Sequence, residues 1–201
     1  MAEPRRRRAA TEEKLTLLLD VTEEIILREG YAAVSSRSVA ARAGIQAPLV
    51  HYYFPTIDDL FVAVLRRRAE PNVEKMAAAM ASPEPLRAWW QLASDPRGTA
   101  LFFELIAAAN HRAALKAEVG KVAREVRQMQ MKTLAAILDE YELDPLEFPP
   151  ALIATAMQGV ALALVADEVA GYDTAHAQAR KAMNRLVGRL EQRRADRNGV
   201  R

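Results

Sequence analysis

The sequence predicts an all-α protein in which a small N-terminal helix-turn-helix domain of three helices is joined to a larger helical domain. Apolar residues make up 51% of the chain, enough for a sizeable core, whereas aromatic residues make up only 6%. Alanine, leucine, arginine and glutamate dominate the composition, and these residues favour helices over strands. Apolar residues also recur at helical spacing between Gly and Pro breakers along the chain.

Cysteine is absent, which excludes disulfide bonds and thiolate metal sites. The three histidines, His51, His111 and His176, are scattered, and neither a Gly-rich phosphate loop nor a nucleophile elbow occurs. Asp58 and Asp59 are adjacent, but neighbouring side chains on a helix diverge, and the positive end of a helix explains both carboxylates. We therefore expect no catalytic residue, no metal and no cofactor, and we do not expect an enzyme.

No targeting segment is expected. The arginines Arg5–Arg8 are followed closely by charged residues, unlike the apolar stretch of a secretory signal. The longest uncharged apolar run, 151–166, is shorter than the about 20 residues that span a bilayer. These features predict a soluble cytoplasmic protein with no membrane partner.

The net charge of +2 says little about partners, but the distribution of charge says more. No Asp or Glu occurs between Gly30 and Ile57, although the chain holds 26 acidic residues. The same stretch contains Arg37, Arg42 and His51. A surface that must approach phosphate has reason to exclude carboxylates, so this stretch is the expected nucleic-acid contact.

Residues 1–10 are predicted to form a disordered basic arm, because four of them are consecutive arginines. A solubilising tail and a contact with phosphate or the minor groove are both open interpretations of this arm. Residues 195–201 are predicted to be a disordered tail. Between these ends, we expect a helix-turn-helix domain over 11–57 and a regulatory and dimerisation domain over 58–194.

The first helix is predicted over 12–29. Thr11 is a good N-cap, Glu12 and Glu13 suit the positive end of the first turn, and Gly30 ends the helix. One face of this helix carries Leu15, Leu18, Leu19, Thr22, Ile25 and Ile26.

Two short helices are predicted next. Ser35 caps the first of them and Gly44 ends it, whereas Gln46 opens the second, which ends at Pro55. Pro48 is tolerated because the amides of a first turn have no partner within the helix. Two short helices joined by a tight Gly turn indicate a helix-turn-helix, whose second helix enters the major groove.

A fourth helix is predicted to start after Thr56, with Asp59 completing a capping box, and to run through Arg68. Its apolar stripe consists of Leu60, Phe61, Val64 and Leu65.

The stretch from Gly30-Tyr31 to Asp59-Leu60 resembles the DNA-binding domain of the TetR family of one-component repressors. The resemblance rests on Val39-Ala40-Ala41-Arg42-Ala43-Gly44-Ile45 and on Leu49-Val50-His51-Tyr52-Tyr53-Phe54-Pro55-Thr56. It implies a homodimer with an N-terminal reading head and a divergent C-terminal domain that binds ligand and forms the dimer. The DNA-binding positions that it implies are Arg37, Gln46, Ala47, Pro48, Leu49, His51, Tyr52 and Thr56.

Two departures from the family pattern affect these positions. Ile57 stands where the family usually has a lysine, which removes one phosphate contact. Leu49 stands where Thr is frequent, which suggests apolar readout such as contact with a thymine methyl. Tyr53 and Phe54 are expected in the core, and Arg42 is expected on a solvated face.

Prolines divide the rest of the chain into further predicted helices, because proline interrupts helical hydrogen bonding. These helices are expected over 72–81, 84–94, 98–111, 113–141, 150–171 and 174–194.

An apolar effector site is expected between the helices of 84–141. Trp89 and Trp90 point about 100° apart on a helix, so they occupy different environments and one of them can line a cavity. The alternative is that these large side chains only fill the core. The expected ligand-binding residues are Trp89, Trp90, Phe103, Ile106, Asn110, Met129, Gln130 and Gln158.

The last two predicted helices each carry an apolar face, rich in small residues in the first of them, and they resemble the hairpin that forms a four-helix dimer interface in TetR-like proteins. Ordinary packing within one chain is the alternative. The expected interface residues are Ala156, Gly159, Val160, Ala163, Met183, Leu186, Val187 and Leu190.

Together these expectations describe a repressor that a small, mostly apolar effector releases from a palindromic DNA operator. A DNA-binding dimer without an effector is the first alternative, and a helical enzyme or small-molecule carrier is the second.

Overall fold

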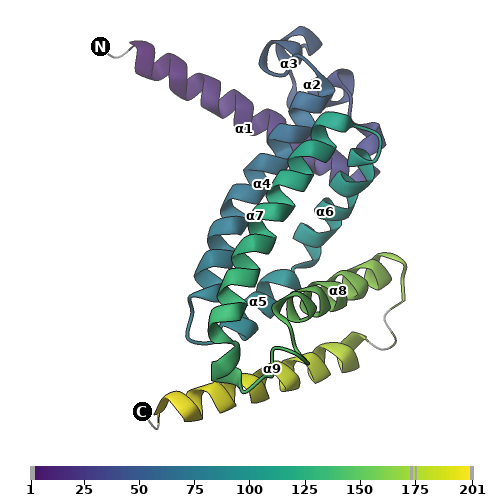
Figure 1. Cartoon of the computed structure of the whole chain (residues 1–201). Helices are drawn as coiled ribbons and strands as arrows, with labels where there is room; N and C mark the ends of the chain where they lie inside the picture. Colours follow the sequence, from purple (N-terminus) through teal and green to yellow (C-terminus); the bar gives the residue numbers. More distant parts are fainter. Residues whose placement is uncertain (1–2, 173, 175, 200–201) are drawn as a thin grey trace. The chain divides into compact units, whose positions relative to one another are not determined.

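The computed structural model describes residues 3–172, 174 and 176–199. Within these residues the chain is entirely helical, which confirms the predicted fold class (Figure 1). The α-helices are α1 (Glu3–Glu29), α2 (Ser36–Ala43), α3 (Ala47–Tyr53), α4 (Ile57–Met80), α5 (Pro85–Ala93), α6 (Pro96–Ala109), α7 (Ala113–Ile137), α8 (Pro150–Val169) and α9 (His176–Gly199). Two short 3-10 helices, η1 (Tyr31–Ala33) and η2 (Leu138–Tyr141), follow α1 and α7.

The chain divides into two compact units. Unit 1 consists of residues 1–70 and 101–121, and unit 2 consists of 71–100 and 122–201. Helices α4, α6 and α7 each contribute residues to both units. The division therefore differs from a simple boundary after residue 57, because the end of α6 and the start of α7 belong with the N-terminal helices.

The core of unit 1 is built where α1 to α4 and the α6–α7 segment contribute apolar side chains (Figure 1). Val39 of α2 and Val50 of α3 are fully buried, so each short helix turns one face toward this core. Other fully buried members are Leu18, Ile25, Leu60, Phe61, Val64 and Leu115.

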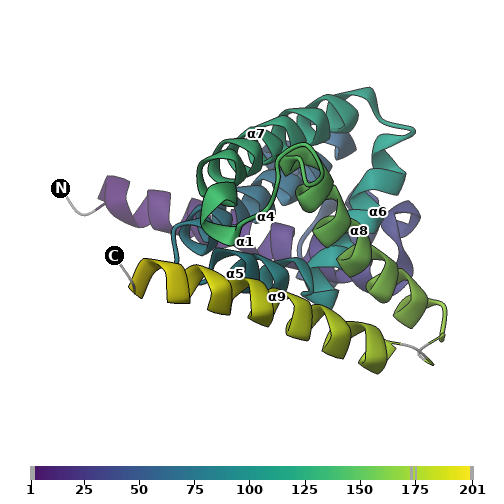
Figure 2. The same cartoon turned by 60° about the horizontal axis from the view of Figure 1, so that its bottom comes forward.

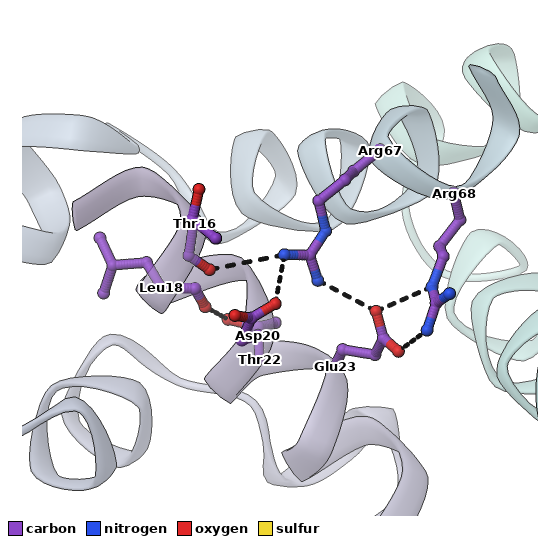
Figure 3. A network of polar contacts seen from close by, with 7 residues as sticks. All are labelled: Thr16, Leu18, Asp20, Thr22, Glu23, Arg67 and Arg68. Atoms are coloured by element: carbon purple, nitrogen blue, oxygen red, sulfur yellow. Dashed lines mark hydrogen bonds and ion pairs between the residues drawn. The ribbon is translucent and has the colours of Figure 1, made fainter. Parts of the chain in front are cut away.

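A polar network joins α1 to α4 beside this core (Figure 3). Glu23 of α1 is buried, and it accepts hydrogen bonds from Arg67 Nη2 at 3.0 Å and from Arg68 Nε at 2.9 Å. Arg67 Nη1 also donates to Asp20 Oδ1 at 2.6 Å. Burial alone raises the pKa of the Glu23 carboxyl, but the hydrogen bonds and charges of Arg68 and Arg67 outweigh it and hold that pKa below its ordinary value.

Unit 2 is organised around α5, which packs against α8 and α9 (Figures 1 and 2). The first turn of α5 is capped from α9: Glu191 Oε1 accepts from the backbone N–H groups of Leu86 at 2.8 Å and of Arg87 at 3.1 Å. Tyr141 donates its hydroxyl to the other oxygen of Glu191 at 2.9 Å. Burial and the neighbouring carboxylate raise the pKa of the Tyr141 phenol, so it stays a donor.

Several predicted boundaries are wrong. Pro71 does not end a helix, because α4 continues through it to Met80, so no separate helix spans 72–81. Helix α1 begins at Glu3, within the stretch predicted as a disordered arm. Helix α9 continues to Gly199, beyond the predicted end at 194. In all three cases the helix continues beyond the end that the local sequence predicts.

Helix α8 is long and apolar enough to cross a membrane by length and composition alone, over Pro150–Glu168. This stretch includes Asp167 and Glu168, so it is longer than the uncharged run 151–166. One face of α8 nevertheless packs into unit 2 through Ala154, Met157 and Leu164. About a quarter of the window is buried (28%), so much of this apolar helix is left uncovered in the single chain.

Candidate nucleic-acid interface

Three local devices fix the two ends of α2 and the start of α3. Ser35 and Ser38 cap the start of α2 reciprocally: Ser38 N donates to Ser35 Oγ at 3.1 Å, and Ser35 N donates to Ser38 Oγ at 2.9 Å. Gly44 ends α2 in the left-handed conformation, with φ 65° and ψ 32°. Pro48 lies in the first turn of α3, where no intrahelical partner is lost. The sequence signals for both short helices are therefore correct.

Helix α3 is short, and only its inner face has a core to fill. Val50 is fully buried, whereas Tyr52 is 77% exposed and His51 is exposed. Tyr53 is half-buried and meets Tyr52 edge to face, with ring centroids 5.2 Å apart. This packing orients an aromatic side chain that projects from the surface, as a base or phosphate contact requires.

The remaining predicted contact residues lie at the same corner of unit 1, on α2 and at the start of α3. Arg37 is exposed on α2. Gln46 and Pro48 are also exposed, while Ala47 and Leu49 are partly buried and pack against or beside the core. These residues offer hydrogen-bond donors and apolar atoms, and none of them is acidic.

Arg42 differs from Arg37. Its guanidinium pairs with the carboxylate of Glu29 at the end of α1. Because this ion pair occupies Arg42, the structure supports the interpretation of Arg42 as a surface residue rather than a base reader.

Thr56 has its donors occupied. Both its backbone N–H, at 2.9 Å, and its hydroxyl, at 2.7 Å, donate to Asp59 Oδ2, and Asp59 N donates back to the hydroxyl at 3.1 Å. Asp58 beside it pairs with Arg112, whose guanidinium lies over the Phe61 ring, 4.8 Å from its centroid. Thr56 can offer a donor to phosphate only if the hydrogen bonds of this capping box break. This disfavours Thr56 as a phosphate contact.

A glutamate that no sequence signal indicates anchors the backbone just before the helix-turn-helix. Glu104 of α6 accepts a hydrogen bond from the Tyr31 backbone N–H at 2.8 Å. Gly30, just before it, has φ 82° and ψ 162°, a conformation open essentially to glycine. Glu118 of α7 likewise binds Arg66 of α4 through two hydrogen bonds, at 2.8 and 3.0 Å. Only tertiary structure places these carboxylates, so no local signal points to them.

The fold of α1 to α4 and the surface that α2 and α3 present are those of a helix-turn-helix domain. Residues 18–64 match the model of the bacterial regulatory proteins of the tetR family. This match covers the N-terminal helix-turn-helix part of the chain, which is therefore similar to the bacterial regulators of that family. No curated protein matches the chain in sequence.

Several solved structures share the fold of this chain. A TetR-family regulator from Rhodococcus sp. superposes with a TM-score of 0.69 at 15% identity, over 89% of this chain and 99% of that one. A regulator from Saccharomonospora viridis in complex with choline gives 0.73 at 17%, over 88% and 96%. The multidrug-binding protein EbrR, complexed with imidazole, gives 0.57 at 27%, over 86% and 94%.

The predicted ligand-binding residues are divided between the two units. Phe103, Ile106 and Asn110 belong to unit 1, and Asn110 is exposed. The other five belong to unit 2, where Trp89 and Gln130 are buried. The residues of unit 2 are Trp89, Trp90, Met129, Gln130 and Gln158.

The predicted dimer residues are also divided, between an outer and an inner face. Ala156, Gly159 and Ala163 of α8 are exposed, and a Cβ added at Gly159 would meet nothing within 4 Å. Leu152 (49% exposed) and Leu186 of α9 (47% exposed) are uncovered large apolar side chains. Val160, Met183 and Leu190 are partly buried against the core of unit 2. Val187 is buried in that core, so it is unavailable to a partner and was assigned to the wrong face.

Proposed function

We propose that the protein is a homodimeric repressor whose α3 helix reads a palindromic DNA operator and whose unit 2 binds a small, mostly apolar effector that releases it. The observation that carries the DNA-binding half is the exposed face of α3, with Tyr52 and His51 turned outward from a buried Val50. Arg37, Gln46, Ala47, Pro48 and Leu49 complete the proposed contact set.

The charge pattern supports the same surface. The described stretch between Glu29 and Asp58 has no carboxylate, and the carboxylates that border it are paired, Glu29 with Arg42 and Asp58 with Arg112. Phosphates therefore meet little repulsion there.

The dimer rests on the uncovered apolar face of α8, which is formed by Leu152, Ala156, Gly159 and Ala163, together with Leu186 of α9. Small residues allow a second helix to approach closely, and a second copy of the chain offers a matching face by symmetry. A dimer places two copies of α3 on one DNA duplex, as a palindromic operator requires.

The effector is supported by chemistry and by similarity. Unit 2 buries two tryptophans among methionines, which favours an apolar ligand. Two proteins of the same fold were solved with small molecules, choline and imidazole. An effector lowers DNA affinity only if it binds the DNA-incompetent conformation better than the competent one.

The double variant His51→Ala, Tyr52→Ala tests the DNA-binding surface. Both side chains are exposed, so the variant should keep its helicity and its oligomeric state while losing specific DNA binding by at least about tenfold, as loss of base contacts predicts. Lys132→Ala, an exposed cation on α7, is the matched control and should bind DNA as the wild type does. Unchanged DNA affinity of the double variant, measured by fluorescence anisotropy, would move the interface away from α3.

A further inference from the structure

The two adjacent tryptophans of α5 are not equivalent. Trp90 donates its indole N–H to Asn184 Oδ1 of α9 at 2.9 Å. Trp89 is fully buried, and its indole Nε1 has no hydrogen-bond partner among the described residues. A buried donor without a partner is unfavourable, because it has lost its hydrogen bonds to water and gained none.

No described residue accepts a hydrogen bond from Trp89 Nε1. Trp90 and Tyr141, which belong to the same apolar cluster, both have partners. The carboxylate of Glu191 is committed to the Tyr141 hydroxyl and to the first turn of α5. The other buried polar side chains described in unit 2 are Thr99, Gln130 and His176.

Methionine is concentrated around the same tryptophan. Six of the seven methionines in the sequence lie in this cluster or pack against it. Methionine side chains are unbranched and adapt their shape to a neighbour at low cost. A core rich in them can rearrange around a guest molecule more easily than a core of branched residues. The methionines are Met76, Met80, Met129, Met131, Met157 and Met183.

From these observations we propose that the effector is an uncharged, largely apolar molecule with a carbonyl or ether oxygen, which accepts a hydrogen bond from Trp89 Nε1 inside the methionine-rich cluster. The inference rests on the proposed function, because it names the chemical class of that effector. The buried carboxylate of Glu191 is committed, which disfavours a cation, and no described lysine or arginine is among the buried residues of unit 2, which disfavours an anion.

Three probes separate the possibilities, and the first two have the same size and shape. 2-Octanone carries the acceptor, 2-methyl-1-octene replaces its oxygen by a methylene group, and octyltrimethylammonium carries a charge. Binding is measured by thermal shift and by the two indole N–H signals in a ¹⁵N–¹H spectrum, which Trp90→Phe assigns. Release of DNA is measured in parallel on an operator obtained by selection from random sequences.

The ketone should bind wild type and Trp90→Phe about tenfold more tightly than the alkene, as one recovered hydrogen bond predicts. It should shift the Trp89 indole signal downfield and release DNA. Trp89→Phe should bind ketone and alkene equally. If Trp89→Phe fails to fold, the indole shift in the wild type decides alone.

Other outcomes overturn the inference in distinguishable ways. Equal binding of ketone and alkene without an indole shift, with release of DNA by both, removes the hydrogen bond and leaves the effector function standing. Binding and release by the ammonium probe alone replaces the neutral class by a cationic one. Binding of none of the three probes by a protein that still binds its operator removes this ligand class. Absence of any selected operator contradicts the proposed function itself.

Discussion

Gly30 and Gly44 lie on either side of α2, and a side chain would be strained to different degrees in their backbone conformations. Gly44 is left-handed at φ 65° and ψ 32°, and Gly30 has φ 82° and ψ 162°. We expect Gly44→Ala to lower the free energy of unfolding by about 1 kcal/mol, and Gly30→Ala by about 2 kcal/mol because its region is essentially closed to side chains. Urea unfolding measures both. Gly44→Asn is the control and should cost less than Gly44→Ala, since Asn tolerates this region; equal costs for Gly30→Ala and Gly44→Ala would contradict the argument.

The free energy of unfolding is expected to depend on pH through the carboxyl group of Glu23. Its pKa in the folded protein lies below its ordinary value of 4.5, so its contribution is complete above pH 4.5 and is lost as the pH falls through the folded value. Glu23→Gln should lower the free energy of unfolding at pH 7 by about 2 kcal/mol, the range of hydrogen bonds to charged groups.

The difference between wild type and Glu23→Gln should shrink below pH 4.5 and vanish at lower pH. Unfolding curves for both proteins between pH 7 and pH 3 measure it. Asp20→Asn is the matched control, because Asp20 is more exposed and binds Arg67 alone. A difference that stays constant over this range would show that the carboxylate charge of Glu23 is not what holds Arg67 and Arg68.

Some residue roles were predictable and others were not. Val50, Phe54 and Tyr52 have the burial that helical spacing predicts, because a short helix has only one face toward the core. The sequence also indicates that Trp89 and Trp90 differ, but not which one lacks a partner, because Asn184 lies on a distant helix. The hydrogen bond between Glu104 and the Tyr31 backbone could not be predicted for the same reason, because the two residues are far apart in the sequence.

Among the signals for helix ends, those around the two short helices were reliable and Pro71 was not. Ser35, Gly44 and Pro55 mark the ends of α2 and α3 correctly, because short helices end where local conformation forces them to. Pro71 was wrongly taken as an end, since α4 loses one hydrogen bond there and continues. Long helices are held by packing on both sides of such a defect.

Pro71 also lies at the boundary at which α4 passes from unit 1 to unit 2. Pro71→Ala restores an N–H donor in an exposed helix interior, so it should raise the free energy of unfolding by up to about 3 kcal/mol. Differential scanning calorimetry measures the effect. Pro83→Ala, outside the helices, is the control and should change stability little. A destabilised Pro71→Ala protein would mean that the proline conformation is required at this place.

At the scale of the whole molecule, the proposed dimer makes a sharp prediction. Gly159→Arg and Ala163→Arg place a charge on the apolar face of α8, at a cost of several kcal/mol if it is buried by a second chain. Because both positions are exposed in the single chain, the fold should survive while sedimentation shows monomers.

Ala135→Arg, at an exposed position of α7, is the matched control and should remain dimeric. Dimers of unchanged affinity for both α8 variants would place the interface on another face.

The division of the chain into units was only partly predictable. The sequence indicates where the helix-turn-helix lies, because its signals are local. It does not indicate that residues 101–121 join it, since Arg112 and Glu118 meet Asp58 and Arg66 only after folding.

Selection of bound sequences from a random DNA library tests whether a dimer of this protein reads DNA through α3. We expect an enriched inverted repeat whose half-sites lie about one helical turn, roughly 34 Å, apart. The enrichment should be lost in the variant His51→Ala, Tyr52→Ala. Recovery of no enriched sequence by the folded wild-type protein, or the same enriched sequence with the double variant, would contradict it.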